Sequence, residues 1–415
     1  MVTEKIDQVL PDLRNTLINL SKLNSVTPPS DTRNIVSYSK ELLSGIPGVE
    51  IQTIEEVSPI DNLVAHTKGH QPGKHLLLNG HLDTFEVVQP NLWRHDPFGA
   101  EIEDGKLFGV GVSDMKAGCA SLIETFILLG RNPSMWSGEV TLILVGGEEA
   151  GGKHGTQYLL ETMPALRNVD ACLIADVGSS RSIRFGEKGR YRFKMSAKGI
   201  PGHGAHLHKA KNAIELLIDA IVDYRERVRK LPSRCPPDII NLIKEAGPIS
   251  ESVAGKGETQ TLLNVTSNIG VFHAGTAPNL VPGYAEVIID SRLPIGISPD
   301  DIEETLKQLC SDRKEISFTT LMRCESLYSD PSHELLSILK SNAQKVFGLP
   351  CATTIRVGGT DGKHTRRYGI NTFSCGVEGA NMGAPDEYVE FSELEQCFKI
   401  HALSAFEYLK KPIGK

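Results

Sequence analysis

Hydrophobic residues in the first part of the chain form short continuous runs, separated by stretches in which apolar positions recur with helical spacing. A continuous run bounded by turn residues is typical of a strand buried on both faces of a sheet. Four such runs occur at 76–78, 107–111, 140–145 and 170–177. Helical spacing is found at 33–44, 115–129 and 155–163. The alternation predicts an α/β sheet flanked by helices.

The second half of the chain has a different pattern, in which apolar and polar residues alternate as in a strand with one exposed face. From Gly189 onward the predicted order is strand, helix, strand, strand, helix, strand. These elements lie at 189–199, 212–231, 260–272, 281–293, 298–310 and 315–323. This βαββαβ order predicts a self-contained ferredoxin-like domain. We therefore expect residues 187–326 to be inserted into a larger domain formed by 1–186 and 327–415.

Elements near the two ends of the chain complete the predicted large domain. An amphipathic helix opens the chain, and Pro11 is expected in its first turn, where proline leaves no hydrogen bond unmade. Beyond the insertion, helices are predicted at 333–347 and 392–409, with a buried strand at 371–377. Ser298 and Pro299 suit the N-cap and first position of the second inserted helix.

Composition excludes several classes of function. The net charge of −7 provides no basic surface for nucleic acid. The apolar runs are shorter than the roughly 20 residues that a membrane span needs, and the N-terminus lacks the pattern of a secretory signal. Eight cysteines are scattered without CxxC pairs, which is typical of free thiols in a reducing compartment. We expect a cytoplasmic enzyme or binding protein that acts on small molecules.

Two adjacent carboxylates mark the centre of the chain. Glu148 and Glu149 directly follow the strand at 140–145 and are flanked by glycines on both sides. Like charges in one small volume are costly unless a cation neutralises one of them. One carboxylate could then bind a metal ion and the other could act as a base, as in a metal-dependent hydrolase. The alternative is an exposed acidic pair in a polar loop.

Other residues with metal-ligating side chains occupy equivalent positions. His81, Asp114, Glu149 and Asp176 each lie at or just beyond the carboxyl end of a predicted strand, where α/β sheets gather ligands. One imidazole and three carboxylates suit one or two divalent cations. Asp83 could hydrogen-bond His81 and fix its tautomer. Each residue alone could equally be a helix cap, but four together favour a metal site.

Three motifs carry a resemblance to a known family. The segments NGHLDT (79–84), LFGVGVSDMKAG (107–118) and GGEEAGG (146–152) resemble, in this order, the motifs of the M20-type metallohydrolases. That family includes acetylornithine deacetylase, succinyl-diaminopimelate desuccinylase, aminoacylase and glutamate carboxypeptidase. The resemblance implies a zinc-peptidase-like mixed sheet with an inserted domain that serves as a lid and in dimerisation. It also implies hydrolysis of an amide-type C–N bond in a small carboxylate-bearing substrate, such as an N-acyl amino acid.

The resemblance implies a role for each residue of the metal site. His81 and Asp176 would hold one metal ion, Asp114 would bridge two, and Glu149 would hold the second. Glu148 would be the general base that activates water. A cis peptide between Asp114 and Met115 is also implied.

The inserted domain and the C-terminal part contain further motifs of the family. GIPGHGAHLHKAKNAI (199–214) places His203 as the residue that stabilises the oxyanion, often in the partner subunit's site of a homodimer. His206 and His208 lie beside it, as a separate zinc site or, more simply, as part of a solvated loop. Other positions correspond to substrate-binding groups: Asn279, Arg292, Arg356, Gly358, Gly359 and Thr360. Arg292 could instead form a salt bridge with Asp290.

One position departs from the family pattern. The family ends its metal site with a histidine four residues before a late glutamate, and Gly383 occupies that position in NMGAPDEYVEF (381–391). We therefore expect one tightly bound divalent metal, Zn or Mn, with a second that is weak, absent or completed by a residue such as His364. The missing ligand keeps two alternatives open. They are a single-metal aminohydrolase acting on a non-peptide C–N bond, such as an aromatic amine, and a catalytically silent binding protein.

Overall fold

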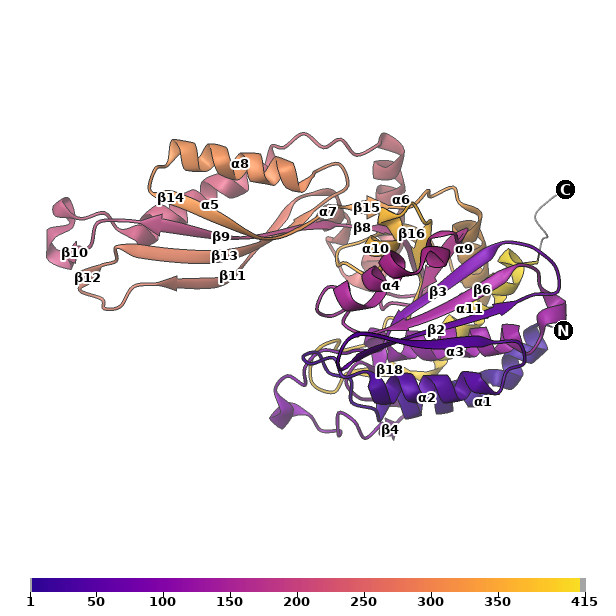
Figure 1. Cartoon of the computed structure of the whole chain (residues 1–415). Helices are drawn as coiled ribbons and strands as arrows, with labels where there is room; N and C mark the ends of the chain where they lie inside the picture. The colour runs from indigo at the N-terminus through magenta and orange to yellow at the C-terminus, as the bar shows by residue number, and fades with distance from the viewer. Residues whose placement is uncertain (1, 411–415) are drawn as a thin grey trace.

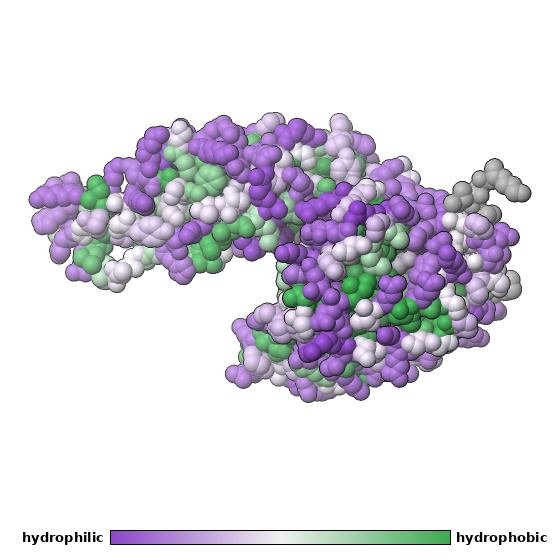
Figure 2. All heavy atoms as spheres, in the orientation of Figure 1, coloured by the Kyte–Doolittle hydropathy of each residue, from purple (hydrophilic) through white to green (hydrophobic). Residues whose placement is uncertain are grey.

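The computed structural model describes residues 2–410 as a large α/β unit and an elongated arm that projects from one side of it (Figure 1). Residues 2 and 410, the first and last described, lie in the large unit, and the arm is formed by the middle of the sequence. The surface is hollowed beneath the arm, where it leaves the large unit (Figure 2).

A nine-stranded mixed sheet forms the centre of the large unit. The strand order is β1 (Glu50–Val57), β2 (Ile60–Lys68), β6 (Glu139–Val145), β3 (His75–His81), β7 (Ala171–Ile174), β17 (Thr372–Ser374), β8 (Ser182–Glu187) and β15 (Leu327–Tyr328), with β16 (Ala352–Arg356) also paired to β8. Strands β6, β3, β7 and β17 are parallel, so their carboxyl ends share one edge. This edge carries the predicted metal ligands of β3, β6 and β7.

Helices cover both faces of the sheet. One face packs against α1 (Val2–Ser21), α2 (Arg33–Ser44), α3 (Ala117–Gly130), α9 (Glu334–Phe347) and α11 (Phe391–Tyr408). The other face contributes Val64, Leu77 and Ile143 to a smaller core under α4 (Tyr158–Thr162). α10 (Gly362–Arg367) packs near β17. The predicted mixed α/β sheet flanked by helices is therefore confirmed.

The arm contains a four-stranded antiparallel sheet with the order β11 (Thr266–Ala274), β13 (Tyr284–Leu293), β9 (Gly189–Lys198) and β14 (Ile316–Cys324). Helices α5 (Ala213–Arg229) and α8 (Pro299–Asp312) cover one face of this sheet (Figure 1). This is the predicted βαββαβ order. Ser298 caps α8 and forms a capping box with Asp301. The domain boundaries, and the roles in lid closure and dimerisation, stay predictions.

Several elements differ from the prediction. Pro11 lies inside α1 rather than in its first turn. Proline has no N–H to donate, and because Pro11 is exposed, water can bond the backbone carbonyl that is left without a donor. The segment expected to be a strand from residue 260 begins as α7 (Glu258–Leu263), because Leu262 packs into the main core. α6 (Pro237–Ala254), rich in prolines at its start, was not predicted and neither were β8 and β16.

Two general expectations concern the whole chain. Within residues 2–410, no helix has both the length and the apolar character needed to cross a bilayer. All eight cysteines are free thiols, and five of them are buried: Cys119, Cys172, Cys351, Cys375 and Cys397.

Candidate active site

Three of the four predicted metal ligands meet at the carboxyl edge of the large sheet. One ring nitrogen of His81 and one carboxylate oxygen each of Asp114 and Glu149 lie within 4.8 Å of one another. His81 Nε2 is 3.2 Å from Asp114 Oδ1, and both side chains are almost completely buried. The arrangement offers one nitrogen and two oxygen ligands to a divalent ion.

Asp114 reaches this position by a different path from the one predicted. The strand before it, β5 (Lys106–Phe108), pairs with β4 (Ile102–Glu103) and β18 (Tyr388–Glu390) in a separate three-stranded sheet, so Asp114 does not follow a strand of the large sheet. It lies in a turn before α3 that contains the implied cis peptide with Met115. Gly111 makes the turn with φ of 71°, and a Cβ there would come within 2.0 Å of Thr84. Only glycine fits.

Glu387 holds this turn in place, although the sequence analysis gave it no role. Its two buried carboxylate oxygens accept hydrogen bonds from the amides of Gly111 (3.0 Å) and Ser113 (2.9 Å) and from the Ser113 hydroxyl (2.6 Å). The Asp114 amide also donates to it at 3.4 Å. Its position directly after Asp386 in the late PDEY segment was the available signal.

Asp83 orients two parts of the site, but in a different way from the prediction. The Nδ1 atom of His81 donates to the backbone carbonyl of Asp83 at 3.0 Å, whereas the Asp83 carboxylate is 3.7 Å from that nitrogen. This bond turns Nε2 towards Asp114, on the side where a metal ion would bind. The carboxylate instead accepts the amides of Glu148 and Glu149, both at 3.1 Å. Asp83 therefore fixes the acidic pair as well as the imidazole.

The electrostatics of the cluster fit a bound cation. Glu149 Oε1 is buried and has no hydrogen-bond partner among the described residues. Burial, with the nearby charges of Asp114 and Glu148, raises the pKa of Glu149 to about 9. A divalent ion would satisfy the unpaired oxygen and neutralise the crowded carboxylates. The residues present therefore fit a metal ion held by His81, Asp114 and Glu149.

Asp176, the fourth predicted ligand, lies close by but has another partner. It follows β7 by two residues, and its Oδ1 is 2.5 Å from Nη1 of Arg356. Burial raises the pKa of Asp176 to about 6, although the Arg356 charge opposes this shift. Arg356, predicted to bind a substrate carboxylate, is thus paired with a carboxylate of the protein itself.

Glu148 stands beside the cluster with its side chain 11% exposed, and a half-buried lysine faces it. Lys363 Nζ lies 3.5 Å from Glu148 Oε1. Lys363 was not predicted as a site residue, since nothing in the spacing connects residue 363 with residue 148. The fold brings them together because α10 packs against the turn that follows the acidic pair.

The glycine loop after β16 has a fixed and an open part. Thr360 donates its amide (2.6 Å) and hydroxyl (3.1 Å) to the buried Glu187, so both of these donors are already used within the protein. Gly358 and Gly359 are half-buried, and a Cβ at Gly359 would meet nothing within 4 Å. His364 lies behind this loop, where its Nε2 is 3.1 Å from the Gly151 carbonyl, and it does not join the metal cluster.

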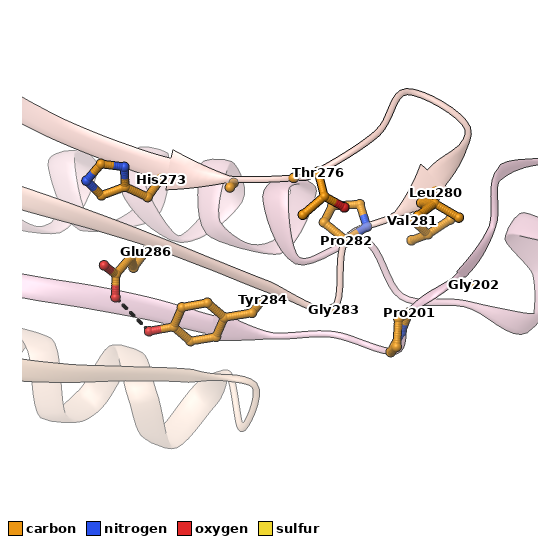
Figure 3. A pocket seen from close by; sticks show the side chains of 12 residues that line it. Pro201, Gly202, His273, Thr276, Leu280, Val281, Pro282, Gly283, Tyr284 and Glu286 are labelled. Atoms are coloured by element: carbon orange, nitrogen blue, oxygen red, sulfur yellow. Dashed lines mark hydrogen bonds between the residues drawn. The ribbon is translucent and has the colours of Figure 1, made fainter.

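The remaining predicted residues belong to the arm. His203 in β10 (Gly202–His203) pairs with Leu280 in β12 (Leu280–Val281), next to Asn279, at the tip farthest from the large unit (Figure 1). A cavity of about 710 Å³ opens beside them, and its lining includes Pro201, Thr276 and Tyr284 (Figure 3). The Tyr284 hydroxyl donates a hydrogen bond to Glu286. His206 and His208 are exposed and form no metal-binding group with His203.

Arg292 lies in β13 and pairs with Asp290 at 2.8 Å, the salt bridge that was weighed against substrate binding. Arg192 and Arg190 surround the same carboxylate at 2.8 and 3.9 Å. Three guanidinium groups therefore share a single acid. A cavity of about 550 Å³ adjoins Arg192 and Arg292.

Comparison with known proteins decides the family. Residues 77–407 match the model described as peptidase family M20/M25/M40. The chain belongs to this family. A succinyl-diaminopimelate desuccinylase from Paracoccus denitrificans is 31% identical over 402 residues, covering 94% of this chain and 97% of that protein. Another, from Parvibaculum lavamentivorans, is 26% identical over 357 residues, covering 84% and 82%.

Solved structures share the fold of this M20 protein. The M20 family metallo-carboxypeptidase Sso-CP2 from Sulfolobus solfataricus superposes with a TM-score of 0.77 at 19% identity, covering 95% of this chain and 98% of that one. Human carnosine dipeptidase 1 gives 0.74 at 16% identity, covering 99% and 98%. The protein is a metal-dependent amide hydrolase, and the relatives do not favour the aminohydrolase or the silent binding protein.

Gly383 occupies the position at which the family pattern has a metal-binding histidine. It has φ of 67°, and a Cβ built on it would lie 3.5 Å from the ring of Phe85. No metal ligand comes from this position, and neither His364 nor another described residue joins His81, Asp114 and Glu149 as a member of the same group.

Proposed function

We propose that His81, Asp114 and Glu149 hold one divalent ion, Zn or Mn, and that Glu148 is the general base of amide hydrolysis. The unpaired buried oxygen of Glu149, next to Glu148, is the observation that carries this proposal. When bound, the ion supplies Lewis acidity that lowers the pKa of coordinated water. Glu148 accepts the proton of the attacking water and delivers it to the leaving amine. Lys363 Nζ, 3.5 Å from Glu148 Oε1, forms an ion pair with this carboxylate.

Replacement of Glu148 by Gln tests the base. The amide keeps the size of the side chain but cannot accept the proton, so kcat should fall by about 10²–10⁴-fold. The metal content should stay unchanged. Glu149→Gln is the matched control, because it should lose the metal as well as the activity. Retained turnover in Glu148→Gln would show that another group is the base.

We infer a single ion because two positions expected at the metal site, Asp176 and Gly383, do not offer it a free ligand. Asp176 is paired with Arg356, and Gly383 has no side chain to offer a second ion. Asp114 belongs to every version of the site, so Asp114→Ala should remove all catalytic metal. A loss of one equivalent relative to wild type supports a mononuclear site. A loss of two equivalents would contradict it.

The substrate that we propose is a small N-acyl amino acid or a related amide with carboxylate groups. Arg190, Arg192 and Arg292 give the open face of the arm an excess of positive charge over Asp290, and the desuccinylase relatives are named for an acidic acyl group. Gly358 and Gly359 let the backbone approach a carboxylate. Arg292→Gln should raise KM for succinylated more than for acetylated amino acids. An equal change for both would remove this role.

A homodimer would bring the arm tip of one copy to the metal cluster of another. His203 and Asn279 lie at the tip, while Val271 and Phe272 of the edge strand β11 and Val222 of α5 are exposed. We propose that His203 stabilises the oxyanion in the partner's site. A mixture of His203→Ala and Glu148→Gln subunits should then regain part of the activity that each lacks, because one site of the hybrid has both residues. Failure of exchanged hybrids to regain activity would refute this arrangement.

The free cysteines support a reducing, cytoplasmic location.

A further inference from the structure

A second cluster of metal-ligating side chains lies at the opposite end of the large sheet. One ring nitrogen each of His66 and His75 and one carboxylate oxygen of Glu139 lie within 4.8 Å of one another. They belong to three neighbouring strands, β2, β3 and β6, at the amino ends of β3 and β6. His81 is at the other end of β3, so this cluster is about 20 Å from the catalytic residues at 3.3 Å per strand residue.

Strand register brings these three side chains to one face of the sheet. Glu139 is directly opposite His75 on β3, while His66 on β2 is opposite Thr141, the next residue of β6 that points to the same side. The cluster is therefore set by backbone pairing across three strands and not by a flexible loop. All three side chains are half-buried, open enough to admit an ion and shielded enough to retain one.

Hydrogen bonds hold the two imidazoles in place. His66 Nε2 is 2.8 Å from Glu139 Oε2, and His75 Nε2 is 2.8 Å from the Thr141 hydroxyl. The two rings meet edge to face with centroids 5.8 Å apart. Lys68, 3.6 Å from Glu139 and largely exposed, is free to swing away when an ion binds.

We propose that His66, His75 and Glu139 form a second, non-catalytic site for a borderline divalent ion such as Zn²⁺, with water as the remaining ligand. Two imidazoles and one carboxylate favour Zn²⁺, Co²⁺ or Ni²⁺ over Mg²⁺ and Ca²⁺, which prefer oxygen ligands. The ion links three strands at the end of the sheet that takes no part in catalysis. It thereby stabilises the folded chain.

Metal counting on the full-length protein tests this site. The protein is stripped with a chelator, dialysed against Zn²⁺ and analysed for bound metal. His75→Gln should bind one equivalent less than wild type, with kcat/KM unchanged for the reloaded enzyme. The increase in Tm on adding Zn²⁺ should shrink in the same variant. Asp114→Ala should show the opposite pattern, losing activity but keeping the distal ion.

The chain offers a matched control in His154, which is half-exposed and 2.8 Å from Glu56 but has no second histidine in its cluster. His154→Gln should leave the metal count unchanged. If His75→Gln does not fold, the isosteric Glu139→Gln must lose the same equivalent. Co²⁺ loaded into Asp114→Ala should give a visible ligand-field spectrum that the added His75→Gln change abolishes. Equal metal content in wild type and the distal variants, or an equal loss in His154→Gln, would overturn the proposal.

Discussion

Glu387 provides a test of how the protein positions a metal ligand, because it holds the turn that carries Asp114 without being a ligand itself. Its carboxylate is 1% exposed and accepts four hydrogen bonds from the turn that carries Asp114. Substitution by Gln keeps the shape but replaces one oxygen by an NH₂ group. If that NH₂ group faces the Gly111 amide, two hydrogen-bond donors face each other where the amide donated to a carboxylate oxygen before.

The size of the effect follows from the bonds involved. A hydrogen bond to a charged group contributes about 1.5–3 kcal/mol, against about 0.5–1.5 kcal/mol for a neutral one. Losing the bond to Gly111 and weakening those to Ser113 should therefore lower the free energy of unfolding by about 2–4 kcal/mol. Because Asp114 moves with the turn, metal affinity should also fall by about 10–100-fold, the usual result of removing a group that orients a ligand.

Two measurements separate these effects. Urea denaturation of the metal-free protein gives the change in stability, and competition with a chelator of known affinity gives the change in metal binding. Glu390→Gln is the control, since this exposed glutamate three residues later is not bonded to the turn and should leave both quantities unchanged. Wild-type metal affinity in Glu387→Gln would refute the reasoning, because the turn would then hold Asp114 without its acceptor.

Three further predictions concern single residues. Burial raises the pKa of Glu124 to about 7, so the folded chain binds more protons than the unfolded one between pH ~4.5 and ~7 and stability falls by about 3 kcal/mol as pH rises through this window. Glu124→Gln should flatten that slope in denaturation curves at pH 5 and 8; an unchanged slope would exclude Glu124 as its source. Gly111→Ala should cost about 2–5 kcal/mol in urea unfolding, from left-handed backbone and the contact with Thr84, whereas Gly105→Ala, with similar φ but open space, should cost only about 1–2 kcal/mol. Asp83→Asn should lower kcat/KM by about 10–100-fold, because one amide of the acidic pair loses its acceptor; full activity would show that the pair needs no such support.

Local patterns in the sequence predict the parts of the fold that have short-range causes. The buried runs at β3, β6 and β7 show which strands form the centre of the sheet, and Ser298 with Pro299 marks the start of α8 correctly. Residues at strand ends, such as His81 and Glu149, are found for the same reason: the carboxyl edge of a parallel sheet is a fixed place.

Long-range pairings could not be predicted in this way. Lys363 meets Glu148, and Arg356 meets Asp176, across 180 residues or more of sequence, and no local spacing encodes either contact. The strand assigned to 260–263 failed because burial of Leu262 against the main core outweighed the local preference. The distal cluster was missed because its two histidines and one glutamate converge only through strand register.

The chain passes between the large unit and the arm four times: from β8 into β9, from α5 into α6, from α7 into β11 and from β14 into β15. β15 pairs with β8 at this joint. A ten-residue strand is about 33 Å long, so a tilt of about 10° at the joint would move the far end by about 6 Å. Glu187 lies at the joint and accepts hydrogen bonds from Thr360 of the glycine loop. A tilt of the arm would therefore displace its tip much farther than the loop beside the metal cluster.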